Sequence, residues 1–567
     1  MRAVDLKIAA ALADLPARPV RLPEEADPDA IVRALVANQV PLLEIPEPAE
    51  RLSGAAAWRQ AVSGEADARS RLLAQFEAVA GPFREAGIET VLFKSAGGFP
   101  YRSSNLDLLV RPARMDQAAG ILEDAGHLRL PHYREEHKLL YRRFVRGASV
   151  ICVHLHEAVN WGRVLILRGD DVIDRSGPSA EGPYGVASPG DLILITLAHC
   201  LYETDRIRIS DMRAVRKACS SPGLDWDSVS RAAEARGWST GFRSALLIFA
   251  AFERALYVDP RIPSEIIERS RVALGATRWA RAPVARMEWA LEKGPVAAPL
   301  AISKVYSKMH TIERLLGEAE RSPDARLADV CAMLWNLAAN RLGLRCRPAV
   351  VIALSGLDGS GKSAVSTVLA DAMRLCEVPV RVVWSRGGFS PWMEAVKKVA
   401  RAPAVAPGPG DAEAKRRWLA GPVRGSLYSV AVLIEQAIVQ AIRIRLPRRL
   451  GRSIVCDRSG IDNAVDLASK LGRRRLADGS AALAMAIGPS PDLAVLLRVS
   501  PETAMARKPG EEHRGLAGRA RQYDDLAAAL GILVLDAERP LAEVAGEVVD
   551  AGLRTAFSRF GGGAGRR

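Results

Sequence analysis

The spacing of apolar residues predicts helices at both ends of the first 345 residues. Residues 1–75 are rich in Ala, Leu and Arg at helical spacing, and residues 190–345 return to that pattern with Pro and Gly breaks. Short apolar runs between these stretches predict strands over 87–93, 106–110 and 150–155, with a helix over 115–126. The first part of the chain is therefore expected to be an α+β domain with helical extensions.

A different pattern begins after residues 345–348, which we interpret as a domain boundary. Residues 349–355 form a continuous apolar and β-branched run, as expected of a buried parallel strand. Strand and helix patterns then alternate, which implies βαβ units. We therefore expect an α/β domain in which helices flank a parallel sheet. The glycine-rich end predicts a flexible tail. We expect four regions, namely 1–75, 76–345, 346–557 and 558–567.

Composition narrows the function classes. The 567 residues are 49% apolar and 25% charged, which is typical of a folded chain, and we find no run of about 18 uncharged apolar residues that would cross a membrane. The N-terminus is a poor signal peptide, and an amphipathic helix is the better interpretation. Seven dispersed cysteines without a C-x-x-C pair indicate a reducing, cytoplasmic location and argue against structural zinc.

The net charge of +14 raises the question of a nucleic-acid partner. Aromatic residues make up only 5% of the chain, and no stripe of alternating basic and aromatic residues appears. Arginine-rich phosphate sites and a solvated arginine surface explain the charge more simply. We therefore expect a small-molecule partner rather than a nucleic acid; the sequence does not determine the oligomeric state, and a homodimer is one option.

The most specific motif follows the predicted strand 349–355. Residues 356–363, Gly-Leu-Asp-Gly-Ser-Gly-Lys-Ser, fit the phosphate-binding pattern G-x-x-x-x-G-K-[ST] completely, and a helical pattern follows. The expected ligand set comprises Gly356, Asp358, Gly359, Ser360, Gly361, Lys362 and Ser363. In such a loop the backbone N–H groups close around the phosphates of ATP. Lys362 would bridge the β- and γ-phosphates, and Ser363 would ligate Mg²⁺.

This loop resembles that of thymidylate kinases and their relatives. The resemblance extends through most of residues 349–555: Asp457-Arg458 after an apolar strand, the strand 491–500, the arginine-bearing segment beginning at Arg507, and the strand 534–537. It implies a P-loop kinase fold that uses ATP and Mg²⁺. The expected catalytic residues are Lys362, Asp457, Arg458 and Arg507.

The resemblance is weaker where the acceptor would be recognised. Ser459 stands where these kinases usually have an aromatic or similar residue, and their Arg-Glu-Pro-Gly segment is represented only by residues 385–388, which include Arg386. The acceptor is therefore expected to be a nucleoside monophosphate or another small phosphate- or hydroxyl-bearing compound.

For the polar residues of this predicted site, a catalytic role can be set against a simpler structural one. Asp457 could hold the Mg²⁺ shell through water, and Arg458 would face an acceptor phosphate unless it forms only a surface ion pair. In the resembling kinases the position of Asp358 contacts the acceptor. We expect Arg507 to stabilise the negative charge of the transition state. For the arginines that follow it, an exposed position on a solvated helix is nearly as good an explanation as a catalytic role. These arginines are Arg514, Arg519 and Arg521.

The N-terminal half resembles a family of uncharacterised bacterial nucleotidyltransferases. The resemblance rests on residues 91–98, 102–110 and 153–156 and spans roughly 80–255. Nucleotidyl transfer uses two metals held by carboxylates, but Asn105 replaces the first residue of the expected D-x-D pair and only Asp107 remains. Asp107, His154 and His156 could instead bind a softer metal, or they could be a satisfied histidine pair in a degenerate site.

Three functions compete. The first is an ATP-dependent kinase of the thymidylate-kinase-like group. The second is a bifunctional enzyme whose N-terminal half still transfers nucleotides, although we expect that activity to be reduced or lost. The third is a P-loop ATPase that acts as a switch or nucleic-acid-binding module, supported only by the charge. The motif order favours the first function.

Overall fold

The computed structural model divides the chain into two compact units, which are described one after the other. The first comprises Met1–Arg143 and Ile151–Trp335, and the second comprises Phe144–Val150 and Asn336–Arg567. The structure describes residues 3–14, 22–45, 50–93, 105–130, 137–145, 148–149, 152–161, 164–179, 184–317, 322–342, 349–376, 378–384, 430, 434–435, 437–438, 440–470, 490–508 and 515–561.

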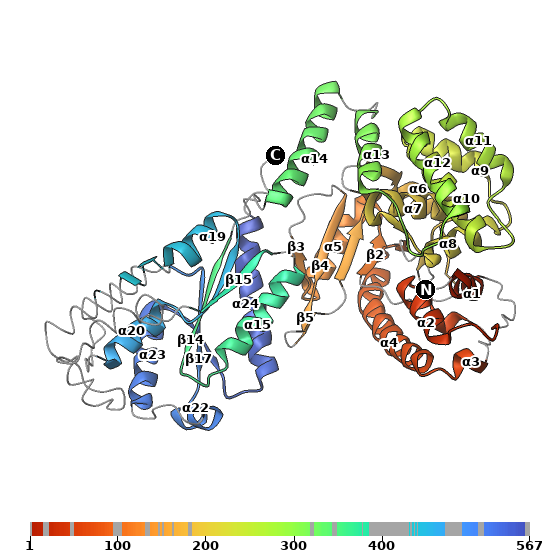
Figure 1. Ribbon diagram of the computed structural model, residues 1–567. Helices are drawn as coiled ribbons and strands as arrows, with labels where there is room; N and C mark the ends of the chain where they lie inside the picture. The colour runs from red at the N-terminus through yellow and green to blue at the C-terminus, as the bar shows by residue number, and fades with distance from the viewer. Residues whose placement is uncertain are drawn as a thin grey trace, which may run out of the picture. The chain divides into compact units, whose positions relative to one another are not determined.

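The first unit is mainly helical and contains one seven-stranded mixed sheet (Figure 1). Its helices are α1 (Ala3–Ala13), α2 (Pro28–Ala37), α3 (Glu50–Ser53), α4 (Ala56–Glu85), α5 (Met115–Asp124), α6 (Gly169–Asp174), α7 (Pro189–His199), α8 (Ile209–Cys219), α9 (Trp226–Ala235), α10 (Ser239–Leu256), α11 (Ser264–Leu274), α12 (Arg278–Lys293) and α13 (Lys304–Leu316). Helix α14 (Pro323–Leu342) runs through the division between the units.

The mixed sheet has the strand order β10-β11-β1-β2-β7-β4-β3. Its strands are β1 (Val91–Leu92), β2 (Asn105–Leu109), β3 (Leu128–Leu130), β4 (Lys138–Arg142), β7 (Cys152–His156), β10 (Gly177–Pro178) and β11 (Gly185–Val186). Strands β2 and β7 are parallel, and β4 and β7 are antiparallel. Two short pairs of this unit lie outside the sheet: β8 (Ala158–Trp161) with β9 (Val164–Arg168), and β12 (Arg206–Ile207) with β13 (Leu300–Ala301). A further pair, β5 (Phe144–Val145) with β6 (Ala148–Ser149), belongs to the second unit.

Alternation along the two central strands separates an apolar face from a polar one. Leu106 and Leu108 of β2 and Val153 and Leu155 of β7 are buried against α4 and α5 in one apolar cluster. The residues between them in sequence point to the opposite face. The polar side chains of β2 and β7 are therefore gathered on the face that α4 and α5 do not cover.

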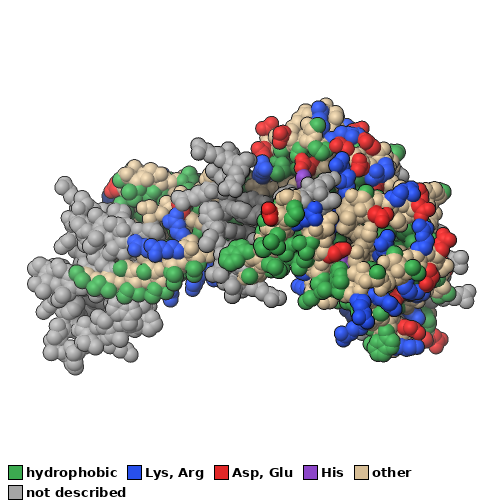
Figure 2. Space-filling model, turned by 90° about the horizontal axis from the view of Figure 1, so that it is seen from above, with side chains coloured by type: hydrophobic (Ala, Val, Ile, Leu, Met, Phe, Trp, Pro, Cys, Tyr) green, Lys and Arg blue, Asp and Glu red, His purple; other side chains and the backbone are tan. Residues whose placement is uncertain are grey.

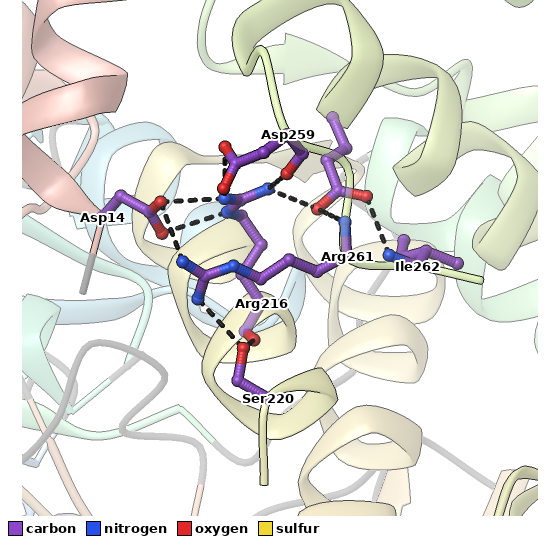
Figure 3. Close-up of polar contacts among 7 residues, drawn as sticks. Asp14, Arg216, Ser220, Asp259, Arg261 and Ile262 are labelled. Atoms are coloured by element: carbon purple, nitrogen blue, oxygen red, sulfur yellow. Dashed lines mark hydrogen bonds and ion pairs between the residues drawn. The ribbon is translucent and has the colours of Figure 1, made fainter. Parts of the chain in front are cut away.

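A buried ion-pair network ties three helices of the first unit together (Figure 3). The fully buried guanidinium of Arg216, on α8, donates to Asp14 at 2.8 and 3.0 Å and to Glu253 of α10 at 2.6 Å. It also bonds the backbone oxygen of Asp259 at 2.9 Å, and Arg261 shares the Asp14 carboxylate at 3.2 Å. Because Asp14 directly follows α1, the network fixes α1 against α8 and α10.

The second unit is built on a parallel sheet with the strand order β15-β16-β14-β17-β18. The strands are β14 (Val351–Gly356), β15 (Val380–Trp384), β16 (Ser453–Asp457), β17 (Leu493–Arg498) and β18 (Leu533–Asp536). The helices are α15 (Lys362–Leu375), α19 (Leu446–Arg449), α20 (Gly460–Lys470), α22 (Pro501–Arg507), α23 (Leu516–Leu530) and α24 (Leu541–Gly561), with a π-helical segment η4 (Gln440–Arg445) before α19. A parallel sheet with flanking helices was expected, and the structure confirms it.

Helices cover both faces of this sheet. On one face α15 packs on α24, and a Cβ on Gly552 would lie 2.8 Å from Leu369 Cδ1, so a glycine permits the close approach. On the other face α20 and α23 contribute Val465 and Leu526 to a cluster with Leu496 of β17. Because all strand pairs of this sheet are parallel, the carboxyl ends of the strands lie at the same edge. Ligands bind at that edge in open α/β sheets.

Several predicted boundaries differ from the structure. The run 87–93 forms only the two-residue strand β1, because α4 continues to Glu85 and Gly87 takes a positive φ of 65° that ends the helix. The boundary expected at residue 75 falls inside α4. The tail expected from 558 begins within α24, which extends to Gly561.

Two further features bear on partners. Over the residues that the structure describes, no helix is both long and apolar enough to cross a membrane. On the face of the first unit visible in Figure 2, Lys and Arg side chains are interspersed with Asp and Glu. The basic residues visible there do not form a single-sign stripe.

Candidate functional site

The glycine loop lies between β14 and α15, as the sequence predicted. Gly356, Gly359 and Gly361 have φ values of 147°, 91° and 88°, which side-chain-bearing residues rarely adopt. A Cβ on Gly356 would lie 2.5 Å from the backbone oxygen of Leu497, and one on Gly359 would lie 2.6 Å from that of Ala504. Both the positive φ and the lack of space for a Cβ atom require glycine at positions 356 and 359.

Lys362 begins helix α15 and lies over the loop. Its side chain is buried, and Nζ donates to the backbone oxygens of Gly356 at 2.8 Å and Leu357 at 2.7 Å. The ammonium group and the N-terminus of α15 both supply positive potential at the mouth of the loop. An anionic group is the ligand that this arrangement favours.

Two hard oxygen ligands meet beside the loop. Ser363 Oγ donates to Asp457 Oδ2 at 2.6 Å. Asp457 ends β16, which is the direct neighbour of β14 in the sheet and pairs Asp457 with Leu354. A hydroxyl and a carboxylate at the start of a helix suit Mg²⁺, which prefers oxygen ligands and keeps several of its waters.

Arg458 is held in a strained and buried position. Its φ is 84°, in the left-handed region, and its side chain is 9% exposed. The guanidinium pairs directly with Asp358 of the glycine loop, whose side chain is 10% exposed. The alternative of a surface ion pair is therefore wrong. Strain at a non-glycine residue is a common property of functional positions.

Sequence analysis missed Asp462, which organises this end of the sheet. Its fully buried carboxylate accepts bonds from Ser355 Oγ at 2.7 Å, Ser459 N at 2.9 Å and the hydroxyl of Tyr523 at 2.9 Å. Burial and this carboxylate hold the pKa of Tyr523 well above its ordinary value. The signal was present, since Ser459 followed three residues later by Asp462 before an apolar run is a capping box. Asp462 thus fixes β14, the Asp457–Arg458 turn and α23 together.

Two other predicted arginines, Arg507 and Arg519, bond residues outside the glycine loop. Arg507, at the end of α22, donates to the backbone oxygen of Ala537 at 2.8 Å. Arg519 donates to Ser469 at 3.4 Å. The segment with Arg386 and the position of Arg514 lie outside the described residues. Arg448, in helix α19 before β16, donates to the Asp492 carboxylate at 3.1 and 3.2 Å.

A second polar site lies on the face of the mixed sheet opposite α4 and α5, where its residues are buried. Asp107 of β2 is directly opposite His154 of β7, and His156 lies two residues further along the same face. Asp107 Oδ1 is 3.0 Å from His154 Nδ1 and 3.1 Å from His156 Nε2. The three ligand atoms lie within 4.8 Å of one another. The structure therefore brings together all three residues that the sequence singled out.

The surroundings of this triad are asymmetric. His156 is fully buried with the Phe93 ring edge-on at 4.7 Å, whereas the side chains of His154 and Asp107 keep 11% and 12% exposure. Burial acts to lower the pKa of His154, but the Asp107 carboxylate outweighs it, so the net pKa is raised. Lys138 of β4 pairs with His156 in the ladder and adds a buried positive charge. The predicted turn 94–98 and residues 102–104 lie outside the described residues.

Comparison with known proteins informs the first unit. No curated protein matches the chain. Residues 32–252, less than half of the 567-residue chain, match the family model described as uncharacterised nucleotidyltransferase. This range contains β1 to β11 and the triad of Asp107, His154 and His156. The match supports the expected resemblance of the N-terminal half, and it begins at residue 32, earlier than the expected start near residue 80.

Proposed function

We propose that the chain is a two-part transferase whose second unit moves a phosphoryl group from ATP to a small acceptor with the help of Mg²⁺. The observation that carries this proposal is the 2.6 Å contact between Ser363 and Asp457 at the mouth of a glycine loop that ends in Lys362. The family match covers the first unit only. The proposal for the second unit is therefore supported by the geometry of its glycine loop and by the order of its motifs.

Each residue has a defined task in this reaction. The loop N–H groups and Lys362 hold the phosphates, while Ser363 and Asp457 would hold Mg²⁺, which neutralises charge on the β- and γ-oxygens. Arg458 faces the acceptor, released from Asp358 when a phosphate-bearing acceptor enters. The acceptor oxygen forms a bond to the γ-phosphorus as the bond to the β,γ-bridging oxygen breaks, and ADP leaves. Asp462 positions both the loop and the arginine.

The direct test is to incubate the protein with Mg·ATP and a panel of nucleoside monophosphates and sugars, and to follow ADP formation. Lys362→Ala should slow transfer roughly a hundred- to a thousandfold, about 3–4 kcal/mol, because a charge-stabilising group is lost. Lys217→Ala, a change on helix α8 of the first unit, is the matched control. Unchanged turnover in folded Lys362→Ala would rule out the phosphotransfer role.

The family match favours a second candidate, in which the first unit also transfers nucleotides. Asp107 is the one carboxylate that remains of the expected D-x-D pair, so we expect this activity to be weak or absent. Label transfer from a radiolabelled nucleoside triphosphate that Asp107→Asn abolishes would establish the bifunctional enzyme. Absence of such transfer in the wild type, with ADP formation intact, would leave phosphotransfer alone.

A further inference from the structure

The nucleotidyltransferase-like site does not fit the metals that nucleotidyl transfer uses. Two Mg²⁺ ions bring four positive charges and require several carboxylate oxygens. On β2 the chain offers Asp107 alone, because Asn105 is neutral, and β7 presents two imidazoles. Lys138 adds another positive charge on the neighbouring strand. One carboxylate cannot compensate this total, so two hard ions are disfavoured.

We propose instead that Asp107, His154 and His156 form a site for a single borderline divalent transition metal such as Zn²⁺ or Co²⁺. Nitrogen ligands distinguish these metals from Mg²⁺, and two histidines with one carboxylate leave at least one coordination position open. The inference is independent of phosphotransfer in the second unit and of any nucleotidyl transfer.

Distances support one ion rather than two. Bonds of about 2.0–2.1 Å to a shared ion place neighbouring ligand atoms roughly 2.9–3.4 Å apart. The two observed separations from Asp107 Oδ1, 3.0 Å to His154 and 3.1 Å to His156, fall in that range. Both imidazoles approach the same carboxylate oxygen, and the three ligand atoms lie within 4.8 Å of one another.

The backbone and the packing prepare this arrangement before a metal binds. The parallel register sets Asp107 beside His154, and the pleat sets His156 on the same face. The Phe93 ring limits the rotation of His156. The partial exposure of Asp107 and His154 leaves a path for the ion and for a water or substrate on the open position. Preformed ligands reduce the ordering cost of binding.

Metal stoichiometry tests this inference directly. The full chain, stripped with a chelator and reloaded with Zn²⁺, should hold one ion per chain, and millimolar Mg²⁺ should not displace it. Asp107→Asn and His154→Gln should each weaken Zn²⁺ binding at least ~100-fold, since even the loss of an outer partner costs 10–100-fold. His137→Gln is the matched control, because His137 is exposed and pairs with Glu157 instead.

Two further measurements keep the test decisive if one of these variants fails to fold. X-ray absorption of the zinc-loaded wild type should show two imidazoles in the first coordination shell. Two simultaneous changes, Asn105→Asp and His154→Asp, should exchange Zn²⁺ preference for Mg²⁺ or Mn²⁺ preference. A wild type that binds no Zn²⁺, two ions of Mg²⁺ per chain, or Zn²⁺ without imidazole in its shell would overturn the assignment.

Discussion

At the scale of single residues, Arg458 has both an unusual backbone conformation and a buried charge. It combines a left-handed φ of 84°, near-complete burial and an ion pair with a carboxylate of the glycine loop. A left-handed, non-glycine residue persists only where its surroundings hold it. The planar guanidinium can contact a phosphate in two places, which lysine cannot.

Arg458→Lys should therefore raise the Michaelis constant for a phosphate-bearing acceptor much more than that for ATP. With a neutral hydroxyl acceptor the same change should mainly lower turnover. Steady-state kinetics with ATP and acceptor varied separately provide the measurement, and Arg554→Lys, an exposed arginine paired with Asp550, is the control. An effect confined to the ATP constant would contradict this role.

His310 offers a residue-scale prediction about pH. It is fully buried between the rings of Trp279 and Tyr306, and burial lowers its pKa to about 3. Within the part of the chain that the structure describes, neither of its nitrogens has a hydrogen-bond partner. Below about pH 6.5 the unfolded chain therefore gains a proton that the folded chain does not. Stability should fall as pH drops, by up to ~1.4 kcal/mol per pH unit.

Urea unfolding of the full chain at pH 7 and pH 5 measures this effect. Wild type should lose up to ~2 kcal/mol for the first unit, whereas His310→Phe should lose distinctly less. His137→Gln changes an exposed histidine and should keep the wild-type pH dependence. Equal slopes in wild type and His310→Phe would show that His310 is not responsible.

At the scale of helices and strands, the buried guanidinium of Arg216 holds three helices of the first unit in place. Arg216→Ala should destabilise this unit by about 3–5 kcal/mol, because the carboxylates of Asp14 and Glu253 lose their buried counter-charge. The midpoint of chemical unfolding measures the loss. Arg269→Ala breaks an exposed pair with Asp227 and should shift the unfolding midpoint far less. Similar costs for both variants would refute the role of the network.

Local sequence patterns predicted the strands and helices of the second unit, but they did not predict the contacts between residues far apart in the sequence. The apolar run ending at Gly356 and the glycine motif are contiguous, so strand, loop and helix could be predicted together. Asp107 and His154 are 47 residues apart, and only the parallel pairing of β2 and β7 brings them into contact. Asp462 and Tyr523 are joined by a tertiary hydrogen bond that no periodicity encodes.

At the scale of the whole molecule, each of the two compact units carries its own proposed ligand site, which predicts separable responses to ligands. A ligand that binds only the folded state stabilises it, by about 2.7 kcal/mol at a hundredfold excess over its dissociation constant. For units of this size that corresponds to roughly 4–6 °C in melting temperature. Mg·ATP should therefore shift one calorimetric transition, and Zn²⁺ should shift the other.

Variants assign each transition to its unit. Lys362→Ala should remove the shift caused by Mg·ATP and retain the shift caused by Zn²⁺, because Lys362 lies over the glycine loop of the second unit. Asp107→Asn should have the opposite pattern, since Asp107 is the only carboxylate of the triad. Equal shifts of both transitions with either ligand would mean that the units do not melt independently. Loss of both shifts in folded Lys362→Ala would contradict the assignment of Zn²⁺ to the first unit.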